Sequence, residues 1–326
     1  MQQEYTIPLS EQPSKRIAWI DCTRIFAALL VVMVHTPVNT SFDYMDAVFI
    51  SSHVPCFYFL SGLFIKKTDW KHILQRILFL LIPYILWNNI AFFLQHESIF
   101  QNLSTDDFGQ TVNLYFHQII LSPADIPFWF LRNLIFYTLL IPFFSAHPKT
   151  SFTAVIVLIV MAQASEYFDA IHFGRNVNGL IFFLLGMMMS RHKTTLTQGI
   201  RSYGAPILIA TVLLSGLAMR YHDIINITGQ LVAICGLMSL GMAMTHYLPS
   251  LSRKFATMAE SCFLLYAIHY PIILICGWKE SMYLPWWNYG YSFIFAIACL
   301  CLSYVLYIGM RKYTPKILRF VAAVKS

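Results

Sequence analysis

The chain has 326 residues, of which 58% are hydrophobic and 11% are charged, and its mean hydropathy is +0.61. Typical soluble chains are about 45–50% apolar and about 25% charged, so most of this surface is expected to face lipid. This composition excludes a soluble enzyme, a secreted module, a nucleic-acid-binding protein and a disordered scaffold. It predicts an all-α fold, a polytopic integral membrane bundle of about ten helices.

Ten apolar stretches lie between polar segments and are candidate membrane spans, since a span takes about 20 residues. They are residues 17–36, 48–65, 77–94, 127–146, 151–165, 177–190, 204–220, 227–246, 260–277 and 290–310. The fifth and sixth are short, so the boundaries within 146–190 are the least defined.

The organisation expected from these spans is one transmembrane domain over residues 1–326. A polar N-terminal tail occupies residues 1–14 and a basic C-terminal tail occupies residues 311–326. The first span is expected to be retained as an uncleaved anchor, because no signal sequence precedes it. No internal repeat stands out.

The net charge of +7 is explained mainly by orientation in the membrane. If the N-terminus is cytoplasmic, 17 of the 22 Lys and Arg residues fall in segments on the cytoplasmic side. This positive-inside bias predicts that both termini are cytoplasmic. The bilayer is therefore the expected partner of the basic residues, and nucleic acid is not.

The first predicted span carries three ionisable side chains, Asp21, Arg24 and His35. Each costs on the order of 3 kcal/mol in hydrocarbon, so each is a functional candidate. At about 100° per residue all three lie on one side of the helix, and the i, i+3 spacing lets Asp21 pair with Arg24. A neutral-range imidazole can move protons. The alternative is an interfacial ion pair with a histidine that reaches the outer surface.

A basic segment follows the second predicted span. It contains Lys66, Lys67, Lys71 and Arg76, four cations within eleven residues that could bind phosphate groups. The alternative is that these cations only satisfy the positive-inside rule or contact anionic lipid.

Other polar side chains fall in the fourth and ninth spans. Trp129 and Arg132 lie near the start of the fourth, and Glu260, Tyr266 and His269 lie in the ninth. A single buried histidine is more often structural, and an arginine near a span end can extend toward the interface. Taken together with the first span, these residues predict a polar cavity through the bundle. No Cys/His spacing typical of a metal site is present, so no metal is expected.

Residues 20–35 resemble the opening helix of the membrane-bound acyltransferase-3 family, bacterial O-acyltransferases that modify cell-envelope polysaccharides. Further similar segments follow in the family's order. They are residues 57–64, Gln75-Arg76 with Pro83-Tyr84, Trp129-Phe130-Leu131 with Pro142, and Tyr266-x-x-His269-x-Pro271. The ordered set covers most of the chain.

The resemblance implies transfer of an acyl group, most often acetyl, from cytoplasmic acyl-CoA to a sugar hydroxyl, with acetyl-CoA as the cosubstrate. The acceptor carbohydrate is either free or lipid-linked, and the location is the bacterial inner membrane. Arg24 and His35 match the family's essential Arg and His, and Arg76 matches a basic position in the loop thought to meet coenzyme A. The chain reaches Ser326 without room for the C-terminal hydrolase domain of some members, which indicates the stand-alone type.

These matches lead to a mechanistic hypothesis. His35 takes the proton from the acceptor hydroxyl, and Asp21 orients Arg24. Direct transfer and a transient acyl-histidine both fit. About 16 Å of helix separates Arg24 from His35. If the helix is straight, the two side chains therefore cannot both touch the thioester of the donor. Expected oxyanion or acceptor contacts are Arg132, His269, Tyr266, Glu260 and Trp129, and expected coenzyme A contacts are Lys66, Lys67, Lys71 and Arg76.

The alternative function is a polysaccharide or small-solute transporter whose Arg, His and Asp side chains form a proton relay. Repeated halves with matching broken helices are typical of transporters, and none is evident in the sequence. A non-catalytic protein of envelope assembly is a third, weaker alternative.

Overall fold

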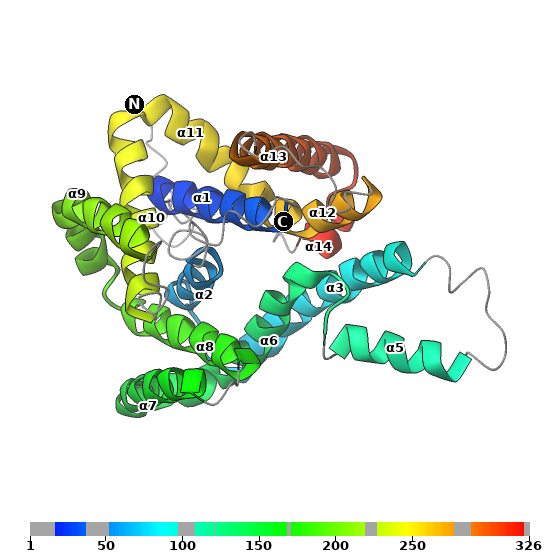
Figure 1. Cartoon of the computed structure of the whole chain (residues 1–326), viewed down its shortest axis with the longest axis horizontal. Coiled ribbons are helices and arrows are strands. Elements are labelled where there is room, and N and C mark those ends of the chain that lie inside the picture. Colours follow the sequence, from blue (N-terminus) through cyan, green and yellow to red (C-terminus); the bar gives the residue numbers. More distant parts are fainter. Residues whose placement is uncertain are drawn as a thin grey trace, which may run out of the picture.

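The computed structural model describes residues 17–36, 52–96, 108–120, 122–167, 171–218, 227–276 and 288–322. The predicted tail 1–14, residues 48–51 of the second span and residues 323–326 lie outside the described residues. The helices (Figure 1) are α1 (Ala18–His35), α2 (His53–Leu63), α3 (Trp70–Gln95), α5 (Phe108–Ile120), η2 (Ile126–Phe128), α6 (Trp129–Ala146), α7 (Pro148–Tyr167), α8 (Ile171–Met189), α9 (Lys193–Ala218), α10 (Ile227–Tyr247), α11 (Pro249–Met258), η4 (Ala259–Ser261), α12 (Cys262–Ile275), α13 (Asn288–Tyr313) and α14 (Pro315–Ala322).

Helix α1 lies at the centre of the bundle and packs against α2, α10, α11, α12 and α13 (Figure 1). Most of its residues are buried, including the small Ala27 and Ala28 that allow close approach of neighbouring helices. Thr23 donates its hydroxyl proton to the carbonyl of Trp19, so this polar side chain is satisfied within the helix. A central position keeps the ionisable residues of α1 away from lipid.

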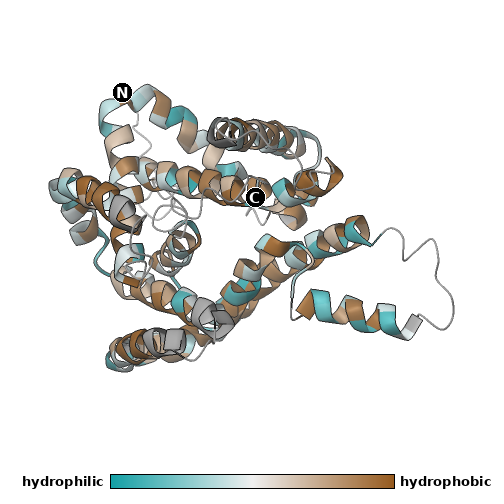
Figure 2. Cartoon of the chain, in the orientation of Figure 1, coloured by the Kyte–Doolittle hydropathy of each residue, from teal (hydrophilic) through white to brown (hydrophobic). Residues whose placement is uncertain are grey.

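The peripheral helices present apolar side chains outward. Only 28% of the apolar window of α3 is buried, and the same holds for α13. Large exposed side chains such as Leu78, Phe93, Ile294 and Val305 lie on these two helices, and Figure 2 shows hydrophobic residues along both. Such extended apolar faces require an apolar surrounding, which the hydrocarbon core of a membrane provides.

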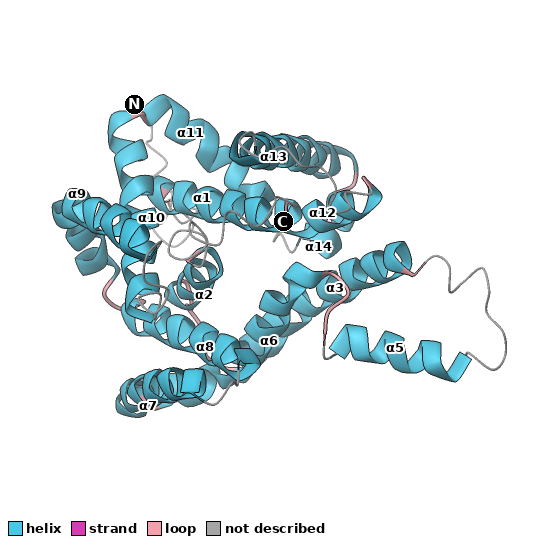
Figure 3. Ribbon diagram, viewed as in Figure 1, coloured by secondary structure: helices cyan, strands magenta, loops and turns pink. Residues whose placement is uncertain are grey.

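Every regular element in the described ranges is a helix (Figure 3), so the all-α prediction is confirmed. Within these ranges, six helical segments are long and apolar enough to cross a membrane. They are Ala18–His35, Trp70–Gln95, Ile126–Ala146, Ile227–Tyr247, Pro249–Ile275 and Gly290–Tyr313. The predicted spans 151–165 and 177–190 correspond to shorter apolar helices, Lys149–Met161 and Val177–Met189. The count of ten and the side of each terminus stay predictions.

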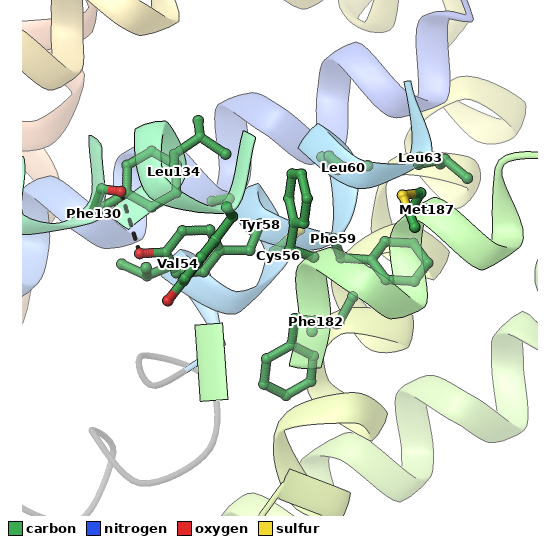
Figure 4. Packing of buried hydrophobic residues seen from close by; sticks show 14 of the residues in the cluster. Val54, Cys56, Tyr58, Phe59, Leu60, Leu63, Phe130, Leu134, Phe182 and Met187 are labelled. Atoms are coloured by element: carbon green, nitrogen blue, oxygen red, sulfur yellow. Dashed lines mark hydrogen bonds between the residues drawn. The ribbon is translucent and has the colours of Figure 1, made fainter. Parts of the chain in front are cut away.

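Helices α2 and α8 cross with their backbones in close contact. A Cβ added at Gly62 would collide with the carbonyl oxygen of Phe183, and one added at Gly186 would collide with that of Phe59. The reciprocal pair of glycines thus sets the distance between the two helices. Phe59, Leu63 and Met187 fill the space beside this crossing (Figure 4).

We expect Gly62→Ala and Gly186→Ala each to destabilise the protein by about 1–3 kcal/mol, because the added methyl must push two backbones apart. Thermal unfolding in detergent measures the effect. Gly204→Ala on α9 is the matched control, since its nearest neighbour atoms lie 3.6 Å from the added carbon. Equal melting temperatures for all three variants would contradict the packing argument.

Candidate active site

Two of the cavities in the described part of the bundle contain the predicted site residues of α1, one with His35 and one with Arg24. The cavity that contains His35 has a volume of about 330 Å³ and is called the outer cavity, following the predicted orientation. The cavity that contains Arg24 has a volume of about 600 Å³ and is called the inner cavity. Tyr266 of α12 lines both cavities, and among the described residues no other side chain does so.

The inner cavity is basic. Arg24 donates from Nη1 to Asp21 Oδ1 at 3.3 Å, as the i, i+3 spacing predicts, and its guanidinium lies 5.1 Å from the ring centroid of Phe64. Arg76 donates from Nη2 to the carbonyl oxygen of Ser61 at 3.3 Å. No acidic side chain is among the described residues that line this cavity. The cavity is therefore suited to an anionic or electron-rich ligand.

The lysines of the loop before α3 lie outside this cavity. Lys66, Lys67 and Lys71 are exposed, and none of them lines it. Lys67 donates to His72 Nε2 at 2.8 Å, and His72 Nδ1 donates to Asp69 at 2.6 Å. The hydrogen bond from His72 lowers the pKa of the Asp69 carboxyl below its usual range. Of the four cations predicted to contact coenzyme A, the structure thus brings only Arg76 to the cavity wall.

Lys193, at the start of α9, was missed by sequence reasoning. Its Nζ lies 4.9 Å from the centroid of the Phe64 ring, on which Arg24 also rests. Partial burial lowers its pKa, and the nearby positive charge of Lys66 lowers it further. Lys193 and Lys66 therefore add positive charge close to Arg24, although Lys193 is far from Arg24 in the sequence.

The outer cavity is built around histidines. His35 of α1 and His53 of α2 line the cavity, and the ring of His269 lies behind that of His35, with centroids 5.5 Å apart. His269 Nδ1 lies 3.2 Å from the carbonyl oxygen of Leu265. Because a carbonyl can only accept, Nδ1 carries the proton and Nε2 of a neutral His269 is an acceptor. This Nε2 is buried and has no hydrogen-bond partner among the described residues.

An aromatic wall separates the two cavities. The Tyr266 hydroxyl donates to the carbonyl of Pro127, and its ring stacks on Phe128 with centroids 5.3 Å apart. Phe130 lies edge-on to Tyr266 at 5.7 Å. Tyr58 packs on Phe130 at 4.6 Å and donates its hydroxyl to the Phe130 carbonyl, the bond drawn in Figure 4. Tyr266 is therefore held in place from several sides.

Two predicted site residues have partners elsewhere. Arg132 donates to Asn133 Oδ1 at 3.3 Å and lines neither cavity. Glu260 accepts from Tyr307 and from Arg311, which ties η4 to α13, and it also lines neither cavity. The structure does not bring these two side chains to His35, whereas it does bring Trp129 and Tyr266 to the outer cavity.

Four polar residues that line the outer cavity are not among the site residues predicted from the sequence. They are His53, Tyr58, Asn178 and Gln230. His53, Asn178 and Gln230 each follow other polar residues at the border of an apolar stretch, where polar side chains are common. Tyr58 lies in a stretch similar to the family pattern. Contacts between distant helices alone reveal them.

The acyltransferase domain model of the acyltransferase-3 family matches residues 17–308, so the chain belongs to this family of membrane acyltransferases. The succinoglycan biosynthesis protein ExoH of Rhizobium meliloti (strain 1021) is 23% identical over 356 aligned residues, which cover 95% of this chain and 92% of that protein. No solved structure gives a significant match.

Proposed function

We propose that the protein is an O-acyltransferase of the bacterial inner membrane that moves an acetyl group from cytoplasmic acetyl-CoA to a hydroxyl of a cell-envelope or exported polysaccharide. The observation that carries this proposal is the pair of cavities that meet at Tyr266, one with Arg24 and Arg76 and one with His35. The similarity to a protein of succinoglycan biosynthesis supports a carbohydrate as the acceptor.

The inner cavity receives the donor. Coenzyme A carries phosphates at one end and a long, thin pantetheine arm that ends in the thioester. Lys193 lies against Phe64, a residue of the cavity wall, and Lys66 is close to Lys193. These two cations attract the phosphates, and charge-assisted hydrogen bonds to phosphate are strong. A volume of about 600 Å³ lies within the usual range of small-molecule sites, roughly 300–1,000 Å³, and so accommodates the arm. Arg24 and Arg76 then flank the arm.

The outer cavity receives the acceptor hydroxyl. The hydroxyl oxygen attacks the thioester carbonyl carbon while His35 takes the hydroxyl proton. The tetrahedral intermediate collapses with cleavage of the carbon–sulfur bond, and the proton held by His35 returns to the departing sulfur. His269 Nε2 has no partner among the described residues, and the two rings lie 5.5 Å apart, so we propose that Nε2 accepts from His35 once His35 is protonated.

Tyr266 lies where thioester and hydroxyl must meet. Among the predicted oxyanion contacts, Tyr266 lines both cavities. Its hydroxyl proton is donated to the carbonyl of Pro127 and would have to leave that carbonyl to reach an oxyanion. The proton of His269 Nδ1 is already used, and Arg132 lines neither cavity. The tight aromatic wall around Tyr266 favours acetyl over longer acyl groups.

The transporter hypothesis has less support. The wall formed by Tyr266, Phe128 and Phe130 interrupts the path between the two cavities. Acyl transfer requires only that the thioester carbonyl carbon reach this wall from the donor side. A transported sugar would need the wall to open fully.

His35→Ala is expected to bind acetyl-CoA as the wild type does but to lose roughly 10²–10⁴-fold in transfer rate, because the general base is removed. Transfer of labelled acetyl to glycan measures the rate. His96→Ala is the matched control, since His96 bonds Gln118 and lines neither cavity, and it should stay within about threefold of the wild type. Transfer by His35→Ala within about tenfold of the wild type would contradict the base assignment.

Arg76→Gln is expected to weaken acetyl-CoA binding by about 1.5–3 kcal/mol, whereas Lys71→Gln is expected to leave it nearly unchanged. The physical reason is that Arg76 lines the inner cavity and Lys71 is exposed outside it. Thermal stabilisation by acetyl-CoA, measured over a range of concentrations, gives both affinities. If both variants lose the same affinity for acetyl-CoA, the cavity position of Arg76 does not explain binding, and membrane orientation remains the explanation of the basic segment.

A further inference from the structure

Three side chains of the outer cavity carry a polar atom for which the described part of the chain offers no hydrogen-bond partner. These atoms are His53 Nδ1, Asn178 Oδ1 and Gln230 Oε1, and all three are buried. The residues come from α2, α8 and α10, so three separate helices supply one polar wall to the cavity that holds His35. Among the described residues, no partner satisfies any of the three atoms.

Unsatisfied buried polar atoms reduce stability, and proteins normally avoid them. Some other buried polar side chains of this bundle are satisfied, whereas Trp19, Asp125 and Ser292 also carry buried atoms with no partner among the described residues. Asn88, fully buried in α3, donates to the carbonyl of Tyr84 and accepts from the backbone N–H of Asp125. Thr138 in α6 donates to the carbonyl of Leu134. The outer cavity differs from these sites because three helices bring unpartnered atoms to one wall, which indicates a local cause.

The chemistry of the cavity narrows the class of ligand. Its polar wall contains two carboxamides and two imidazoles, and no Asp, Glu, Lys or Arg is among the described residues that line it. A carboxamide both donates and accepts, as does a hydroxyl group. Such a wall suits a neutral polyol and offers no countercharge to a phosphate or a uronic acid. Trp129 adds an aromatic surface.

We propose that His53, Asn178 and Gln230 form a subsite for one neutral sugar unit of the acceptor, and that its hydroxyls satisfy these side chains while one hydroxyl faces His35. This inference rests on the proposed function and names the substrate class of the same site. The volume of about 330 Å³ is at the small end of ligand sites, which fits a single sugar unit. The stability lost to unpartnered atoms is the cost of acceptor recognition.

The test uses Asn178→Leu and Gln230→Met, two apolar replacements of similar size. Each full-length variant is expressed in a strain that lacks the wild-type protein. We expect the O-acetyl content of the envelope glycan to fall at least tenfold, while the affinity for acetyl-CoA is unchanged and the melting temperature stays equal or rises. The rise follows because a buried unsatisfied atom has been removed.

Asn88→Leu is the matched control. It removes an amide that has two partners, so its melting temperature should fall. The subsite is contradicted if Asn178→Leu and Gln230→Met keep glycan O-acetylation within about twofold, or if their melting temperatures fall as that of Asn88→Leu does. If the wild-type protein itself restores no O-acetyl groups to the glycan, the proposed function fails and the subsite fails with it.

Discussion

The central constraint on this bundle is that one helix, α1, carries three ionisable side chains that lipid would penalise. Five helices surround α1 and keep it out of lipid. Asp21 and Arg24 pair near one end of α1, and His35 lies at the other end. The helices around α1 therefore need to provide a polar environment at its two ends and not along its middle. The two cavities are the structural result of this distribution.

The wall at Tyr266 explains why Arg24 and His35 are far apart on a straight helix. They serve different cavities, so they do not need to reach the same atom. Arg24 belongs to the basic cavity, where the donor is proposed to bind, and His35 belongs to the neutral one, where the acceptor is proposed to bind. On this proposal, reaction is confined to the point where the cavities meet.

The sequence was sufficient for the helical membrane class and for the Asp21–Arg24 pair, because composition and i, i+3 spacing are local properties. It was not sufficient for Glu260, whose partners Tyr307 and Arg311 lie on another helix. It also gave no indication of Asn178 or Gln230, since both lie beside other polar residues at the border of an apolar stretch and have no distinctive spacing. Cavity walls are assembled by tertiary packing, and only that packing shows which isolated polar residues face one another.

The most direct test of the two-cavity account is transfer across a sealed membrane. Purified protein is reconstituted into vesicles that enclose envelope glycan from a strain lacking the protein, and labelled acetyl-CoA is added outside only. The account predicts labelled O-acetyl groups on the enclosed glycan and free coenzyme A outside, with both lost in His35→Ala. Acetylated glycan that forms only when donor and acceptor share the same side would contradict it.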